Sequence, residues 1–298
     1  MNTNGSKRTL TFTKPPERVV SLVPSMTESL FDLGLGSCLV GITDFCIHPA
    51  AGVAKVPRLG GVKNPDVARI VALKPDLVIA NQEENTPEVV RTLETQGIKV
   101  WVNFPKTIQQ SMDVLWLLAA IFSSHDAARR LETLERSLDW VRATGAEQPH
   151  WSYFCPIWQQ SDPAGDWWMT FNQDTYMSDL LRLLGGENCF ANRQRRYPLE
   201  ADLGLAAAEP PLDRDIRFPR LTRAEILSAN PEMIILPSEP FPYQENDINA
   251  ISEVFAQTRA AQRQQIFPVD GSLLTWHGTR LGKALLNLPE QLHLDKPN

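Results

Sequence analysis

Residues 68–83 read Ala68-Arg-Ile-Val-Ala-Leu-Lys-Pro-Asp-Leu-Val-Ile-Ala-Asn-Gln-Glu83, and residues 224–239 read Ala224-Glu-Ile-Leu-Ser-Ala-Asn-Pro-Glu-Met-Ile-Ile-Leu-Pro-Ser-Glu239. The two segments align without a gap. Each has the pattern of a helix that ends before a proline and is followed by a short apolar strand. A unit that recurs in both halves of a chain predicts two lobes related by pseudo-symmetry.

Apolar runs alternate with helical patterns on both sides of this repeat. The expected strands are 18–23, 39–43, 77–80, 98–102, 151–156, 233–236 and 266–269. The expected helices are 25–34, 65–73, 87–96, 108–122, 175–184, 222–229, 247–259 and 279–288. This alternation predicts parallel βαβ units. Ser25 and Glu28 have the spacing of a capping box, and the proline-rich segment 192–219 is expected to be a surface insertion.

A longer helical pattern lies near the middle of the chain. Between Ser124 and Gly145, apolar residues recur at steps of three and four, which draws one stripe down a helix of about 30 Å. We therefore predict an α/β protein of two Rossmann-like lobes, residues 1–123 and 146–298, joined by a backbone helix over 124–145. A ligand cleft is expected between the lobes. One more amphipathic helix within a single domain is the alternative.

Length and charge narrow the function classes. The 298 residues suffice for two ordinary domains, and the net charge of −6 gives no electrostatic case for nucleic acid or an anionic membrane. The longest apolar run, 114–122, is too short to span a membrane. Residues 1–10 show no apolar signal core or cleavage site, so we expect a cytoplasmic monomer, or a periplasmic protein if a signal peptide was removed. The four scattered cysteines are expected to be free thiols.

Ligands of open parallel sheets bind outside the carboxyl ends of the strands. Here those exits hold Ser25 and Thr27 and the segments 44–48, 82–85, 157–168, 238–243 and 270–277. Aromatic side chains at two of these exits suit stacking on a flat ligand, although core packing also explains them. The ligand-binding candidates are Ser25, Thr27, Asp44, Phe45, Gln82, Glu83, Glu84, Trp158, Trp168, Ser238, Glu239 and Trp276.

Three of the motifs resemble those of the helical-backbone metal receptors, the class III solute-binding proteins of cobalamin, haem and ferric-siderophore importers. They are Val19-Val-Ser-Leu-Val-Pro-Ser-Met-Thr-Glu28, Val56-Pro-Arg-Leu-Gly-Gly61 and Ile70-Val-Ala-Leu-Lys-Pro-Asp-Leu-Val-Ile79. The chain is most similar to the cobalamin-binding branch and its signal-less members. The resemblance implies two lobes on one helix, little hinge motion, and a bound corrinoid, haem or ferric chelate.

The resemblance also implies docking on a membrane permease through one glutamate on each lobe. The matching positions hold Ala68 and Ala224, while Glu225 and Asp66 lie one and two steps away. The missing glutamates put delivery of a ligand to an ABC permease in doubt.

Cys46, His48 and His277 are the candidate metal ligands. Cys46 and His48 are separated by one residue, so both side chains of an extended loop could point the same way. Thiolate and imidazole bind zinc, copper or the metal of a corrin or haem. The alternative is a buried thiol beside a histidine bonded to the backbone.

The sequence lacks the glycine-rich phosphate loop, nucleophile elbow and His-Glu-x-x-His motif of common enzyme classes. We therefore predict a binding protein and not an enzyme, with no certain cofactor. A cytoplasmic metal-binding protein or metalloenzyme that uses Cys46, His48 and His277 is the first alternative. A cleft that serves as a protein interface is the second.

Overall fold

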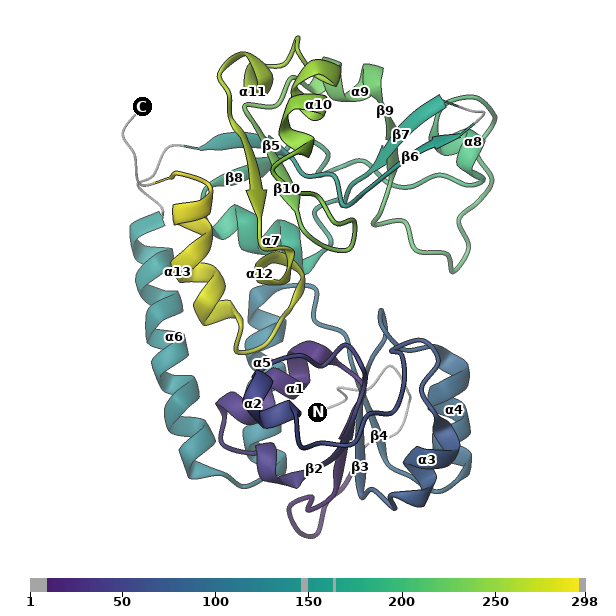
Figure 1. Ribbon diagram of the computed structural model, residues 1–298, viewed down its shortest axis with the longest axis vertical. Coiled ribbons are helices and arrows are strands. Elements are labelled where there is room, and N and C mark those ends of the chain that lie inside the picture. The colour runs from purple at the N-terminus through teal and green to yellow at the C-terminus, as the bar shows by residue number, and fades with distance from the viewer. Residues whose placement is uncertain (1–9, 146–149, 163–164, 295–298) are drawn as a thin grey trace. The chain divides into compact units, whose positions relative to one another are not determined.

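The computed structural model describes residues 10–145, 150–162 and 165–294 (Figure 1). The chain forms two compact units. The first comprises the residues up to Pro105 together with Gln109–Ser137 and Trp276–Gly282, and the second comprises Lys106–Ile108, Leu138–Thr275 and the residues from Lys283. Residues 276–282, which the sequence-based division assigned to the second lobe, thus group with the first unit.

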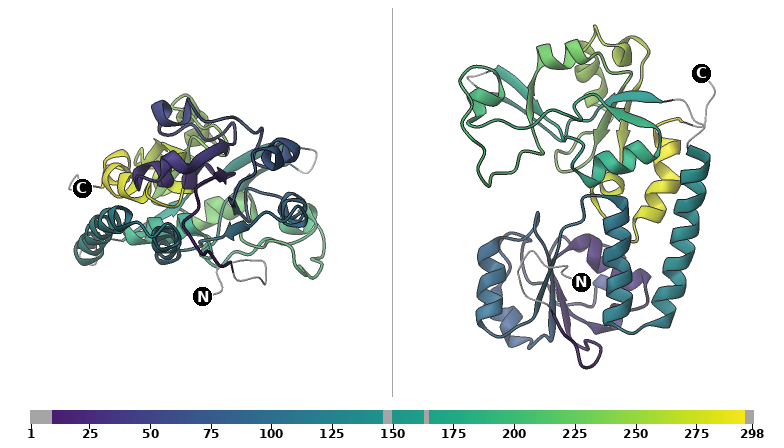
Figure 2. Two further views of the ribbon diagram at one scale, coloured as in Figure 1. Left: turned by 90° about the horizontal axis from the view of Figure 1, so that it is seen from below. Right: turned by 180° about the vertical axis from the view of Figure 1, so that it is seen from behind.

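The first unit is built on a four-stranded parallel sheet in the order β2-β1-β3-β4. Its strands are β1 (Val19–Ser21), β2 (Leu39–Ile42), β3 (Leu77–Asn81) and β4 (Val100–Asn103). Its helices are α1 (Pro24–Asp32), η1 (Gly36–Cys38), α2 (Ala50–Val53), α3 (Val67–Ala72), α4 (Pro87–Thr95) and α5 (Ile108–Ile121), whose first residue belongs to the second unit. Ile70 of α3 and Leu93 of α4 pack on one face of the sheet, and α1 and α5 lie on the other (Figures 1 and 2). Both faces are covered, which explains the continuous apolar runs of the strands.

The second unit holds a parallel sheet in the order β11-β10-β5-β8. Its strands are β5 (Trp151–Phe154), β8 (Gly186–Asn188), β10 (Met233–Pro237) and β11 (Ile266–Val269). The helices of this unit are α7 (Tyr176–Leu183), α8 (Leu199–Asp202), α9 (Arg223–Ala229), α10 (Asp247–Val254), α11 (Arg259–Gln262) and α12 (Gly271–Thr275).

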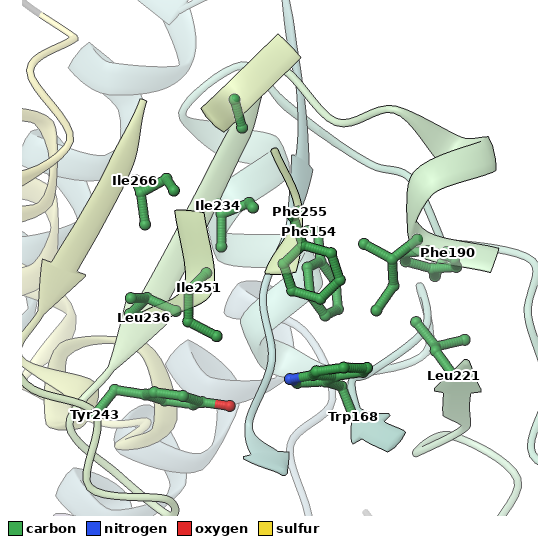
Figure 3. Close-up of a cluster of buried hydrophobic side chains, with 12 residues drawn as sticks. Phe154, Trp168, Phe190, Leu221, Ile234, Leu236, Tyr243, Ile251, Phe255 and Ile266 are labelled. Carbon is green, nitrogen blue, oxygen red and sulfur yellow. The ribbon is translucent and has the colours of Figure 1, made fainter. Parts of the chain in front are cut away.

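An additional three-stranded antiparallel sheet belongs to the second unit. It consists of β6 (Trp158–Asp162), β7 (Gly165–Met169) and β9 (Arg220–Thr222), in the order β6-β7-β9. The sequence analysis treated 157–168 as an exit loop, so these strands were missed. Trp168 and Leu221 pair across β7 and β9 and enter the core beside Phe255 (Figure 3).

Two long helices belong partly to each unit. Helix α6 (His125–Gly145) agrees with the predicted helix over 124–145, and the division of the units falls after Ser137. Helix α13 (Leu281–Gln291) begins in the first unit and continues in the second. None of the helices within the described ranges combines the length and apolar composition needed to cross a membrane.

The predicted capping box at Ser25 and Glu28 is wrong. Helix α1 already begins at Pro24, after Val23, and its first turn has no side-chain cap. A capping box forms instead at the start of α9, where Thr222 and Glu225 bond each other's backbone N–H groups. The carboxylate of Glu28 is buried and pairs with Arg280.

Candidate functional site

Buried polar side chains line the carboxyl edge of the sheet in the first unit. Ser21, Asn81 and Asn103 are the last residues of β1, β3 and β4, and all three are buried. The Asn81 amide donates to Oδ1 of Asn103 at 3.0 Å, and the Thr27 hydroxyl donates to Oγ of Ser21 at 2.8 Å. In open parallel sheets, ligands bind outside this edge.

The segment Trp276–Gly282 packs on this edge. Nε2 of His277 lies 3.3 Å from the Asn81 amide nitrogen, and the Gly278 N–H donates to the Ser111 hydroxyl at 2.8 Å. Burial lowers the pKa of His277 to about 4, so its imidazole is neutral at pH 7. His277 is therefore a buried structural residue that covers the strand ends.

The loop after β2 carries both buried and exposed candidates. Cys46 is buried, and its sulfur lies 3.1 Å from the Thr27 hydroxyl. Nη1 of Arg58 donates to the carbonyl oxygen of Cys46 at 2.8 Å, which fixes the loop. Phe45 and Ile47 point outward and are 59% and 53% exposed. Alternate residues of this loop thus face the interior and the surface.

Trp276 lies next to this loop. Its ring meets the ring of His48 edge to face at a centroid distance of 5.7 Å. The guanidinium of Arg280 lies 4.8 Å from the centre of the Trp276 indole. Phe45, Ile47, His48 and Trp276 form an apolar surface on the first unit, named here the first aromatic patch. A group of exposed apolar side chains of this kind marks an interaction site.

The remaining candidates of the first unit divide by exposure. Asp44, Gln82 and Glu83 are exposed, and Glu84 is half-buried. The ammonium group of Lys63 donates to the carbonyl oxygen of Glu83. Ser25 is buried in α1, and its hydroxyl finds no hydrogen-bond partner within the described ranges.

The candidates of the second unit follow β5 and β10. Trp158 is 39% exposed, and its ring contacts Phe241 edge to face at 5.7 Å. Phe241 in turn lies 4.6 Å from Tyr243, centroid to centroid. Trp158 and Phe241 form the second aromatic patch. Phe241 lies within the predicted exit segment 238–243, although it was not among the ligand-binding candidates.

Other second-unit candidates have structural partners. Trp168 is 5% exposed and lies in the core with its ring 5.0 Å from Phe255 (Figure 3). Ser238 Oγ accepts a hydrogen bond from the Gly271 N–H at 3.0 Å, and Glu239 accepts one from the Thr275 hydroxyl. These bonds hold the first and the last residue of α12.

The predicted three-ligand metal site has no support in the structure. Among the residues that the structure describes, no group of three or more His, Cys, Asp or Glu side chains could hold a metal ion. Burial raises the pKa of the Cys46 thiol, which opposes the thiolate form that metals require. Of the three candidates, His48 is the one that is only half-buried.

The helix starts that match the docking positions carry no free acid. Ala68 and Ala224 are both exposed in the first turns of α3 and α9. Asp66 accepts the Arg69 N–H as the N-cap of α3, and Glu225 completes the capping box of α9. The two neighbouring acids thus cap the N-terminal ends of their helices.

A family pattern described as "Periplasmic binding protein" matches residues 19–271. The chain belongs to this family. The chain is similar to a protein of Bacillus subtilis named as an uncharacterized ABC transporter substrate-binding lipoprotein, with 24% identity over 98% of this chain and 85% of the relative. The vitamin B12-binding protein of Vibrio vulnificus is 28% identical over 62% of this chain, and the match spans 65% of that relative.

The fold agrees with this membership. The crystal structure of a periplasmic vitamin B12-binding protein of Vibrio cholerae matches with a TM-score of 0.74 and 22% identity, over 95% of this chain and 99% of the other. The predicted two-lobed α/β class is confirmed. The expectation of a cytoplasmic protein finds no support in these relatives, which are named as periplasmic or as a lipoprotein.

Proposed function

We propose that the protein is the solute-binding component of an ABC importer for a flat, metal-bearing ligand, with corrinoids as the first candidates and haem or a ferric chelate as alternatives. The observation that carries the proposal is that each unit exposes aromatic side chains where its parallel strands end. Phe45 is exposed and Trp276 is half-buried in the first unit, and Trp158 is exposed in the second. Flat apolar faces of this kind suit a macrocycle.

The relatives support this class of ligand and a place outside the cytoplasm. The Bacillus subtilis relative is named as a substrate-binding lipoprotein of an ABC transporter. The Vibrio vulnificus relative is named as a vitamin B12-binding protein. We therefore prefer an extracytoplasmic solute-binding protein to a cytoplasmic metal-binding protein. Fractionation of the source cells tests the compartment, and recovery of the protein with cytoplasmic markers would contradict it.

His48 is the candidate for direct contact with the metal of the ligand. It is half-buried at the edge of the first aromatic patch, whereas Cys46 and His277 are buried. A neutral imidazole is a common axial ligand of haem. Substitution His48→Ala should change the visible spectrum of the bound ligand if this contact exists.

Titration of the purified protein with cyanocobalamin, cobinamide, haemin and ferric citrate tests the proposal, with tryptophan fluorescence and calorimetry as readouts. We expect one of them to bind, with at least about tenfold weaker binding in Trp158→Ala and Trp276→Ala, because each aromatic contact contributes about 1.4 kcal/mol or more with its buried area. Trp140→Ala is the matched control, since Trp140 is 68% exposed on α6. Failure of all four ligands to bind would reject the proposed ligand class.

A further inference from the structure

Six arginines lie in the second unit between Arg193 and Arg220, in and beside the insertion 192–219. Within the part of the chain that the structure describes, three of them form ion pairs with carboxylates. These pairs are Arg193 with Asp202 and Glu225, Arg214 with Glu209, and Arg217 with Asp215. Arg195, Arg196 and Arg220 form none among the same residues, and only Arg196 of these three is exposed.

Arg195 is a half-buried cation whose donors lack acceptors. Its Nε is buried and has no hydrogen-bond partner within the described ranges. Its guanidinium lies 4.3 Å from the centre of the Tyr197 ring, and that of Arg214 lies 4.2 Å from the same centre. Buried donors of a charged group are normally satisfied, so this one calls for an explanation.

Arg220 is the second cation of this arrangement. Its Nη1 donates to the carbonyl oxygen of Phe218 at 3.0 Å, and its guanidinium lies 5.6 Å from the Trp167 ring. Burial, together with the positive charge of Arg195, lowers the pKa of Arg220 to about 10. The Arg220 guanidinium is therefore charged at pH 7. The segments that carry the two arginines lie side by side, since the backbone N–H groups of Arg196 and Arg220 both donate to the carboxylate of Asp202.

The nearby carboxylate of Asp202 favours the charge of Arg220 but does not cancel the opposing effect of burial and of Arg195. Oδ1 of Asp202 accepts from Arg193 Nη1 at 2.9 Å and from the Arg196 N–H at 3.0 Å. Oδ2 accepts from the backbone N–H of Arg220 at 2.8 Å. The oxygens of this buried side chain are thus directed at groups other than the guanidinium groups of Arg195 and Arg220.

We propose that Arg195 and Arg220 bind one oxyanion, a carboxylate or phosphate group, and that this group belongs to the imported solute. A planar guanidinium matches both oxyanions with paired N–H donors. An anion between the two side chains would accept from Arg195 Nε and offset the repulsion between the charges. The link to the solute rests on the proposed function.

The register of the three-stranded sheet connects this pair with the second aromatic patch. Trp158 pairs with Met169, and Met169 pairs with Arg220. Directly paired residues point to the same face of a sheet, and two strand spacings separate the outer two by about 10 Å. Trp168 and Leu221 occupy the opposite face, toward the core. A solute of moderate size can therefore place an aromatic surface on Trp158 and an acidic group on Arg220.

The first test uses inorganic phosphate and citrate as probes of the arginine pair. We expect binding in the millimolar range or tighter, at least about tenfold weaker binding in Arg195→Gln and Arg220→Gln, and no change in the exposed control Arg196→Gln. The NMR signal of the Arg195 side-chain N–H should shift as phosphate is added. Circular dichroism checks that each variant is folded. If Arg195→Gln does not fold, Arg195→Lys replaces it in the test, because lysine keeps the charge but lacks the paired N–H donors of a guanidinium.

The second test compares cyanocobalamin, which carries a phosphodiester, with cobinamide, which lacks it. We expect a preference for cyanocobalamin that Arg195→Gln and Arg220→Gln abolish. If phosphate binds and no macrocycle does, the anion site stands and the proposed function fails. If macrocycles bind but phosphate and citrate do not bind below about 20 mM, the inference fails and the proposed function stands. The same holds if Arg195→Gln, Arg220→Gln and the control Arg196→Gln weaken the binding of these anions equally.

Discussion

Glu28 and Arg280 are 252 positions apart in the chain, and Nη1 of Arg280 lies 2.8 and 2.9 Å from the two carboxylate oxygens of Glu28. Both side chains are buried, at 1% and 7% exposure. Since Arg280 also stacks on Trp276, the pair ties the segment Trp276–Gly282 to α1 and orients an aromatic side chain of the first patch. One buried ion pair thus supports both the fold of the first unit and its candidate site.

The substitution Glu28→Gln is expected to lower the free energy of unfolding by about 3 kcal/mol or more. The substitution removes the carboxylate charge that faces the buried guanidinium of Arg280 at 2.8 and 2.9 Å, and the loss of one partner of a buried ion pair is strongly destabilising. Urea denaturation monitored by circular dichroism measures the loss. The control is Glu17→Gln, which breaks the exposed pair of Lys14 and Glu17 and should change stability by less than about 1 kcal/mol. Equal losses in the two variants would contradict the structural role given to Glu28.

Most strands of the parallel sheets could be predicted from sequence because they are buried on both faces, whereas the short strand β8 was not predicted. The observed β3, Leu77–Asn81, extends the predicted strand by one residue, and α6 begins one residue later than predicted. The hairpin of β6 and β7 could not be found in this way. Its strands alternate irregularly between polar and apolar residues, and they are stabilised by pairing with β9, which is distant in sequence.

The candidate site could be located from sequence but not resolved into its members. The rule for strand ends selects the loops that carry the two aromatic patches, yet it does not say which side chains of a loop remain exposed. Phe45 and Cys46 are adjacent in one such loop, and the structure exposes Phe45 and buries Cys46. The pair Glu28–Arg280 depends on a contact between segments that are 252 positions apart, which periodicity does not report.

The four cysteines are expected to react slowly with a disulfide reagent in the native protein at pH 8. All are free, and burial raises each of their pKa values, to about 12 for Cys38 and about 11 for Cys189. Because the thiolate is the reactive form, four thiols should react quickly only after unfolding in urea. Rapid native reaction that Cys46→Ser abolishes would instead show an accessible thiolate at Cys46 and would restore the metal-site hypothesis.

The helix starts at Ala68 and Ala224 should accept glutamate without loss of stability. Both positions are exposed in a first helical turn, where the dipole favours an anion by a few tenths of a kcal/mol. Glu225→Ala should in contrast lower stability by about 1–2 kcal/mol, because it removes the capping box and the ion pair with Arg193. Thermal unfolding of Ala224→Glu and Glu225→Ala compares the two directly. If Glu225→Ala is as stable as the wild type, the capping box and the ion pair of Glu225 do not stabilise the fold.

His277 should make the stability of the protein depend on pH below 6.5. Burial lowers its pKa to about 4 in the folded protein, whereas an unfolded histidine titrates near 6.5. Between these values the unfolded state binds the proton and the native state does not. The stabilisation is therefore complete above pH 6.5 and is lost as the pH falls toward 4, at a rate approaching 1.4 kcal/mol per pH unit.

The test compares the wild type with His277→Asn by urea denaturation at pH 7 and pH 5. Other titrating groups contribute to both proteins alike, so the wild type should lose about 2 kcal/mol more than the variant between these values. His125→Asn, a change at an exposed histidine of α6, should follow the wild type. An identical pH dependence in wild type and His277→Asn would mean that His277 takes up its proton in the native state near its ordinary pKa. The strand ends beneath it would then be open to water, because burial in a dry site disfavours the charged imidazolium.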